Sequence, residues 1–173
     1  MQLSVSRRNA VFGGVAGLAA LGGLGLALKK QADSLPPDAA QALWGAEFDT
    51  PDGQVLKMKS LQGKPLVINF WATWCAPCVE EMPLLDVFFR QNSLKGWQML
   101  GLAIDQPSRV RQYLSQNAIS YPIGLAGLQG TDLGRVLGNV QGGLPFTVVL
   151  DGEGGLIQRK LGKLSAQEIN AWR

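Results

Sequence analysis

The chain has 173 residues, of which 46% are hydrophobic and 17% charged, a balance that is typical of a globular domain with a substantial core and excludes a disordered chain. The net charge of +3 is misleading, because four of the 16 basic side chains and none of the 13 acidic ones lie in the first thirty residues. The rest of the chain is close to neutral, so we expect no clustered basic surface and no nucleic-acid partner.

The first predicted element is an uncharged segment of 20 residues, Asn9 to Leu28, flanked by Arg7-Arg8 and Lys29-Lys30. As a helix it would be about 30 Å long, the thickness of the hydrocarbon core of a bilayer. Three interpretations of residues 1–30 remain open. They are an uncleaved signal anchor, a removed signal peptide with the small-x-small triplet Gly25-Leu26-Ala27, and a twin-arginine export signal. Each of them places the rest of the chain outside the cytoplasm.

Residues 31–43 contain Pro36-Pro37 among polar residues and are predicted to be a linker, so the folded domain is expected to span residues 44–173. The domain is predicted to open with a hairpin over Phe48–Leu61. Leu66 to Trp71 is an almost continuous apolar run, which favours a central strand covered on both faces.

The rest of the chain alternates between helical and strand patterns. Asp105 is predicted to cap a helix with Pro107 in its first turn, and Ser165 with Glu168 matches a capping box. This order predicts an α/β fold with a central mixed sheet and helices on both faces. The expected helices lie at about 76–94, 105–117 and 131–138 and from 165 onward, and the expected strands at 99–104, 146–150 and 156–161.

Two residue counts narrow the chemistry. The chain has no histidine, which excludes Ser-His-Asp hydrolysis, Cys-His proteolysis and histidine-ligated metals. It has two cysteines, Cys75 and Cys78, too few for a disulfide-stapled scaffold or a four-ligand zinc site. We therefore expect no metal and no cofactor.

The two cysteines form a C-x-x-C pair that follows a predicted strand and opens a predicted helix, the setting in which such a pair is redox-active. Unpaired N–H groups and the positive end of the helix dipole favour a thiolate there. Cys75 at the start of the helix is therefore predicted to be the nucleophile. Cys78, one turn deeper, is predicted to resolve the mixed disulfide, and Pro77 suits a first helical turn.

Other interpretations of the pair are open to the sequence. An inert structural disulfide is one, although solvent-facing pairs at helix starts are usually labile. Covalent haem attachment would need histidine where Val79 stands. A thiol peroxidase would carry Thr-x-x-Cys, whereas Thr73 is two positions before Cys75. A module that binds Cu(I) or a peptide without turnover also remains open.

The string from Asn69 to Cys78, followed by Glu81-Met82-Pro83, resembles the TlpA/ResA branch of the thioredoxin superfamily. The similarity covers about residues 44–173 and includes the segment Gly143–Thr147. It implies a thioredoxin fold with an added N-terminal hairpin and an extracytoplasmic location. Together with the N-terminal segment, this predicts a single-pass anchor in a bacterial-type cell membrane and a catalytic domain in the periplasm or extracytoplasmic space.

The resemblance also implies an activity and its partners. The activity would be that of a protein disulfide reductase acting on exported proteins, for example in cytochrome c maturation or copper-site assembly. A membrane-embedded thiol electron donor would reduce the enzyme again.

Site residues follow from the same resemblance. Pro145 matches the cis-proline of the family that faces the active-site disulfide, and Leu144 before it would expose its backbone to a substrate segment. Trp74, Ala76 and Pro77 are expected to take part in substrate binding.

Glu81 lies three residues after Cys78, hence on the same face of the predicted helix. It matches the acidic residue of the family that manages protons near the second cysteine, and burial beside the thiols would raise its pKa. Glu80 faces another way and is expected to be solvated. Asn69 occupies the strand position where cytoplasmic thioredoxins carry a buried aspartate. Because an amide cannot exchange a proton, Asn69 strengthens the case for Glu81.

Overall fold

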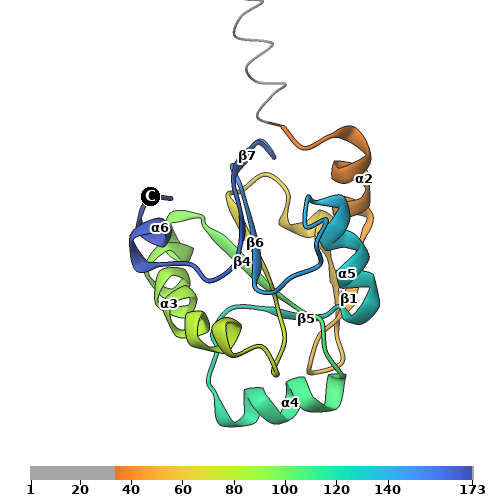
Figure 1. The fold of residues 1–173 in the computed structure, drawn as a ribbon. Helices are drawn as coiled ribbons and strands as arrows, with labels where there is room; N and C mark the ends of the chain where they lie inside the picture. The colour runs from red at the N-terminus through yellow and green to blue at the C-terminus, as the bar shows by residue number, and fades with distance from the viewer. Residues whose placement is uncertain (1–33, 173) are drawn as a thin grey trace, which may run out of the picture. The chain divides into compact units, whose positions relative to one another are not determined.

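A seven-stranded mixed sheet organises residues 34–172, the part of the chain that the computed structural model describes (Figure 1). The strand order is β2-β1-β5-β4-β3-β6-β7. The strands are β1 (Glu47–Asp49), β2 (Val55–Lys57), β3 (Leu66–Trp71), β4 (Gln98–Ala103), β5 (Ile123–Leu125), β6 (Phe146–Leu150) and β7 (Leu156–Leu161). The α-helices are α2 (Pro37–Gly45), α3 (Ala76–Asn92), α4 (Pro107–Gln116), α5 (Gly127–Val136) and α6 (Ala166–Asn170), and two short 3₁₀ helices cover Met58–Leu61 and Ser93–Lys95.

The centre of the sheet is β3, which pairs parallel with β4 and antiparallel with β6. All six residues of β3 are buried, as the apolar run predicted. The expected hairpin is confirmed as β1 and β2, which join the sheet through the pairing of Asp49 with Leu125. The predicted thioredoxin-like α/β architecture with helices on both faces is therefore confirmed.

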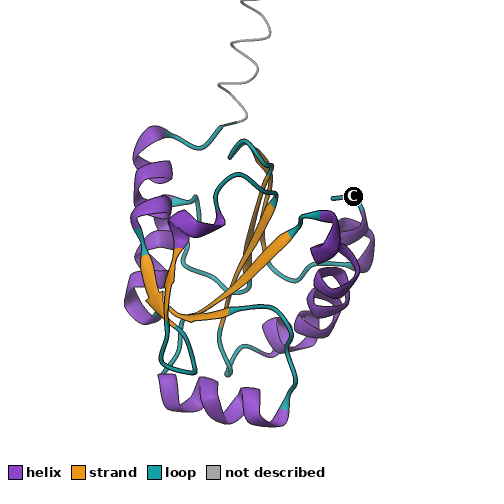
Figure 2. Cartoon of the chain, turned by 180° about the vertical axis from the view of Figure 1, so that it is seen from behind, coloured by secondary structure: helices purple, strands orange, loops and turns teal. Residues whose placement is uncertain are grey.

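The two faces of the sheet carry different helices (Figures 1 and 2). Leu66, Ile68 and Phe70 of β3 pack into a cluster with residues of α2 and α5, on what we call the α2–α5 face. Val67 and Trp71, which alternate with them, pack with residues of α3, α4 and α6 on the α3–α6 face. A strand with apolar residues at every position is thus explained by helices on both sides.

Helix α2 lies where the sequence predicted a linker. The folded unit begins at Leu35 instead of residue 44, and Pro37 occupies the first turn of the helix. Leu35, Ala39 and Leu43 recur every four residues and are buried in the core. The proline pair that resembled a linker is therefore a helix start. The remainder of the predicted linker, residues 31–33, and the expected N-terminal anchor lie outside the described residues.

Three details of the second half differ from the sequence prediction. Strand β5 was missed, because it has only three residues and a glycine at its centre. Helix α5 begins at Gly127, earlier than expected. The N-cap of α4 is Gln106, and the carboxylate of Asp105 instead accepts hydrogen bonds from Thr73 and from the Gln106 backbone. None of the helices within residues 34–172 is long and apolar enough to cross a membrane.

Candidate active site

Cys75 and Cys78 form a disulfide at the start of α3, with their Cα atoms 5.3 Å apart. Cys75 is the N-cap of the helix, and Pro77 lies in the first turn, as predicted. The side chain of Cys75 is 6% exposed and that of Cys78 is 0% exposed. Cys75 is therefore the more accessible of the two cysteines, and its role as the attacking thiol stays a prediction.

The predicted substrate-binding residues surround Cys75 on the surface. Trp74 is 64% exposed, and Ala76 and Pro77 are exposed as well. The Leu144–Pro145 peptide bond is cis, as the resemblance implied. Because Phe146 pairs with Phe70, the Leu144–Pro145 segment lies at the end of the sheet where β3 leads into the disulfide loop. Leu144 is half-buried and Pro145 is buried.

Asp105 holds the loop between β3 and α3. The backbone N–H of Thr73 donates to Asp105 Oδ2 at 2.9 Å, and the Thr73 hydroxyl donates to the same oxygen. Partial burial opposes ionisation of this carboxyl, but the hydrogen bonds from Thr73 and Gln106 outweigh it and lower the pKa of Asp105 below its ordinary value. The loop that carries Trp74 and Cys75 is thus fixed to the end of β4.

Glu81 is 0% exposed and lies on the face of α3 that packs against the sheet. Asn69 Nδ2 donates to Oε1 at 2.8 Å, and the Leu164 N–H donates to Oε2 at 2.7 Å. Burial raises the pKa of Glu81 above its ordinary value, although these hydrogen bonds and the charges of Lys163 and Lys160 act against the rise. This carboxyl is therefore suited to binding and releasing a proton closer to neutral pH than an exposed glutamate.

Glu80, one position earlier, is exposed, as expected, and its carboxylate pairs with Lys163 Nζ at 2.5 Å. The two neighbouring glutamates thus have different environments, because successive helix positions point about 100° apart.

Asn69 and Thr147 form the polar row of the α3–α6 face. They are paired in the β3–β6 register, and Asn69 Nδ2 donates to Thr147 Oγ1 at 3.0 Å. Lys160 of β7 lies opposite Thr147, so the row continues onto the next strand. These three side chains face Glu81 from the sheet.

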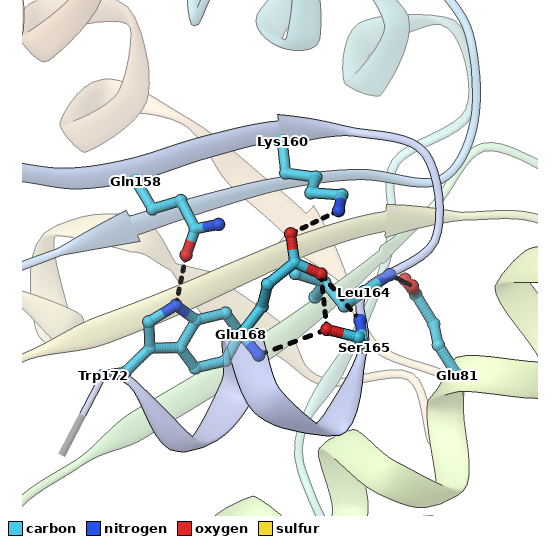
Figure 3. A network of polar contacts seen from close by, with 7 residues as sticks. All are labelled: Glu81, Gln158, Lys160, Leu164, Ser165, Glu168 and Trp172. Atoms are coloured by element: carbon cyan, nitrogen blue, oxygen red, sulfur yellow. Dashed lines mark hydrogen bonds and ion pairs between the residues drawn. The ribbon is translucent and has the colours of Figure 1, made fainter.

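Helix α6 holds the second hydrogen-bond donor of Glu81 in place (Figure 3). Ser165 and Glu168 form the predicted capping box, and Lys160 donates to Glu168. The hydrogen bond from Lys160, together with those from Ser165, lowers the pKa of Glu168 to about 2. The loop before α6, which carries the Leu164 N–H, is therefore tied to β7 through a charged contact that persists into acid.

Sequence reasoning missed three of the groups that shape this site. A threonine inside the buried run Phe146–Leu150 was a signal for Thr147, because a polar side chain there needs a partner. Asp105 was recognised but assigned to helix capping. Nothing in the sequence indicated the role of Leu164, because its backbone N–H, and not its side chain, donates to Glu81.

Comparisons with known proteins agree with this geometry. Residues 30–171 match the family model described as Redoxin. The chain is 26% identical to the thiol-disulfide oxidoreductase ResA of Bacillus cereus over 70% of this chain and 68% of the relative. It is 34% identical to the thiol:disulfide interchange protein DsbE of Tatumella citrea over 66% of this chain and 60% of the relative. A crystal structure of a thioredoxin-family thiol:disulfide interchange protein from Chlorobium tepidum superposes with a TM-score of 0.65 at 27% identity, covering 73% of this chain and 88% of that one.

Proposed function

The chain belongs to the Redoxin family and is a ResA- and DsbE-like thiol–disulfide oxidoreductase, and on this basis we propose that it reduces disulfides in exported proteins outside the cytoplasm. The observation that carries the proposal is the Cys75–Cys78 disulfide at the start of α3, in which Cys75 keeps 6% of its surface exposed and Cys78 keeps none. The structure holds the oxidised form, in which the pair has already given up two electrons.

The reaction runs from the dithiol form. The Cys75 thiolate attacks one sulfur of a substrate disulfide, forms a mixed disulfide and releases the other substrate sulfur as a thiolate. Cys78 then loses its proton and attacks Cys75, which forms the Cys75–Cys78 bond and releases the second substrate thiolate. Two electrons pass from the cysteine pair to the substrate. We assign the proton exchange at Cys78 to Glu81, a buried carboxyl one helical turn away.

The reducing direction is supported by the charges around the pair. A strong disulfide donor stabilises its thiolate, whereas this chain has no histidine and carries a buried acidic side chain, Glu81, one helical turn from Cys78. We expect a potential well below the ~−120 mV of a dedicated disulfide donor when the pair is equilibrated with glutathione. A value near that of such a donor would reverse the direction.

The extracytoplasmic location rests on the uncharged segment Asn9–Leu28 and its basic flanks. We expect the mature protein to fractionate with the membrane and to receive electrons from a membrane-embedded thiol donor. Cell fractionation with mass measurement of the mature chain tests this. A soluble product that begins near Leu28 would remove the anchor and leave export intact.

Trapping tests the roles of the two cysteines. Cys78→Ser should accumulate mixed disulfides with exported proteins, because the resolving thiol is missing, and Cys75→Ser should accumulate none. Trapping by Cys75→Ser would reverse the assignment.

An insulin-reduction assay beside a Cu(I) titration separates an enzyme that turns over from a module that only binds. A thiol peroxidase is disfavoured, because its threonine hydroxyl would have to be available to the peroxide, whereas the Thr73 hydroxyl donates to Asp105.

A further inference from the structure

The amide of Asn69 has an unusual set of contacts for a buried side chain. Asn69 is 0% exposed, and its Nδ2 donates both to Glu81 Oε1 at 2.8 Å and to Thr147 Oγ1 at 3.0 Å. Its oxygen Oδ1 is also buried and has no hydrogen-bond partner within residues 34–172. One end of the amide therefore makes both contacts, and the other end makes none.

A proton on Glu81 would reverse what this carboxyl requires of its neighbours. Oε2 accepts from the backbone N–H of Leu164 at 2.7 Å, a donor that cannot become an acceptor. The proton therefore belongs on Oε1, where it meets the Asn69 NH₂ group, which is also a donor. With the amide as it stands, the protonated acid would lose its contact with Asn69.

We propose that Asn69 is a positioning residue that turns its amide over with the protonation state of Glu81. Nδ2 faces the carboxylate, and Oδ1 faces the protonated acid. The turn exchanges the two ends of a planar amide in nearly the same space. It replaces the two contacts of Nδ2 with contacts of Oδ1, and Nδ2 then occupies the end where Oδ1 has no partner among residues 34–172. The Thr147 hydroxyl can follow, because it donates as well as it accepts.

The turn gives both forms of the buried acid a hydrogen-bond partner. An unpaired polar group in such a place is costly, so a partner of fixed polarity would favour one form and resist proton exchange. The inference rests on the proposed role of Glu81 in handling protons. It gives a reason for an amide at the strand position where cytoplasmic thioredoxins carry a buried aspartate: an amide can offer Glu81 either a donor or an acceptor.

Other titratable groups also surround Glu81. The Cys75–Cys78 pair lies on the same helix, Lys160 and Lys163 come from β7 and the loop after it, and Tyr121 precedes β5. Both lysines donate to other carboxylates, Glu168 and Glu80. Asn69 and Leu164 are thus the groups that hydrogen-bond to Glu81 among the described residues.

The test is an NMR titration of the isotope-labelled full chain from about pH 4 to 9, which spans the range of a raised carboxyl pKa. The nuclear Overhauser contacts between the Asn69 NH₂ protons and Thr147 should weaken several-fold as Glu81 takes up its proton, with the same midpoint as the Glu81 carboxyl. Asn92 is the internal control, because its buried NH₂ donates to the fixed carbonyl of Phe88.

Two variants sharpen the result. Glu81→Gln mimics the protonated acid, so Asn69 should show the low-pH pattern at every pH. Asn69→Leu removes donor and acceptor together and should move the Glu81 midpoint by less than about half a pH unit, because both forms lose a partner. If the Asn69 NH₂ group were instead a fixed donor to the carboxylate, Asn69→Leu should raise the Glu81 midpoint by about one to two pH units.

The outcomes separate this inference from the proposed function. Asn69 contacts that stay constant while Glu81 titrates would overturn the amide turn and leave the proton role of Glu81 intact. A Glu81 carboxyl that does not titrate in this range would overturn the proton role itself, and the amide turn with it.

Discussion

The α2–α5 face and the α3–α6 face of the sheet share the same central strands but differ in what they bury. Six polar or charged side chains are buried within residues 34–172, and five of them belong to α3 or to the positions of β3 and β6 that face it. The sixth, Asn139, lies in the connection between α5 and β6 and donates to the Gly143 carbonyl. The polar groups are concentrated on the face that carries the cysteines.

The difference follows from the two-residue period of β3. Phe70 and Ile68 point to one face, and Asn69 points to the other. Apolar burial stabilises the fold, whereas buried polar groups add little stability even when they are paired. Both faces bury an apolar cluster that stabilises the fold, and we infer that the α3–α6 face differs by also holding buried polar groups for proton chemistry. The two faces should therefore respond differently to substitution.

The largest effect on stability is expected on the α2–α5 face. Leu43 of α2 is 0% exposed, so Leu43→Ala should lower the free energy of unfolding by about 2–5 kcal/mol. The redox potential and its pH dependence should not change. Chemical unfolding and glutathione equilibration measure the two quantities. Leu94→Ala is the control, since Leu94 is 100% exposed. A loss no larger than that of the control would show that α2 is not part of the cooperative unit.

Glu81→Gln should change how the free energy of unfolding depends on pH more than it changes that free energy at low pH. The folded-state pKa of Glu81 is raised, so the folded protein holds this proton to a higher pH than the unfolded chain. Stability from this group is present below the unfolded pKa of about 4.5 and is lost as pH rises through the folded value. The loss amounts to about 1.4 kcal/mol for each unit by which the pKa is raised.

The glutamine variant should lack this loss and unfold at higher denaturant concentration than the native chain near neutral pH. In the reduced protein, thiolate absorbance should also appear at lower pH, because a negative neighbour has been removed. Identical thiolate titrations for the two proteins would make Glu81 an ordinary buried residue.

The central strand and the disulfide site could be predicted from the sequence because their signals are local. The apolar run of β3 and the C-x-x-C pair behind it lie within thirteen consecutive residues, Leu66 to Cys78. Periodicity and helix-start chemistry are enough to place such a segment. The cis bond before Pro145 depended on family resemblance.

The missed features depend on contacts distant in sequence. Thr73 meets Asp105 after 32 residues, and Glu81 meets Leu164 after 83. No local pattern reports such pairings. Helix α2 was missed because its proline pair has two meanings, linker or helix start, and its burial against the core decided between them.

A smaller stability effect is expected at α6. Ser165→Ala removes the side chain that accepts the Glu168 N–H and should cost about 1 kcal/mol. The Leu164 N–H would be held less firmly, so the pKa of Glu81 should rise further. Unfolding curves and carboxyl NMR measure both. Ser115→Ala is a matched control on the exposed side of α4 and should change stability by less than about 0.5 kcal/mol. Equal effects of the two variants would contradict the anchoring role of α6.

The smallest expected effect separates the two lysines near Glu81. Lys160→Met removes the donor that lowers the pKa of Glu168, so that pKa should return toward its ordinary range. A carboxyl with a depressed pKa contributes stability above about pH 4.5, and this contribution is lost as pH falls toward 2. The native and variant chains should therefore differ in stability at neutral pH and converge in acid.

The pKa of Glu81 should rise slightly in Lys160→Met, because a favourable positive charge is lost. Lys163→Met should raise the pKa of Glu81 without changing that of Glu168, since Lys163 pairs with Glu80. Carboxyl NMR of both variants decides the matter, and a shift of Glu168 in Lys163→Met would show that the loop before α6 responds as one charged unit.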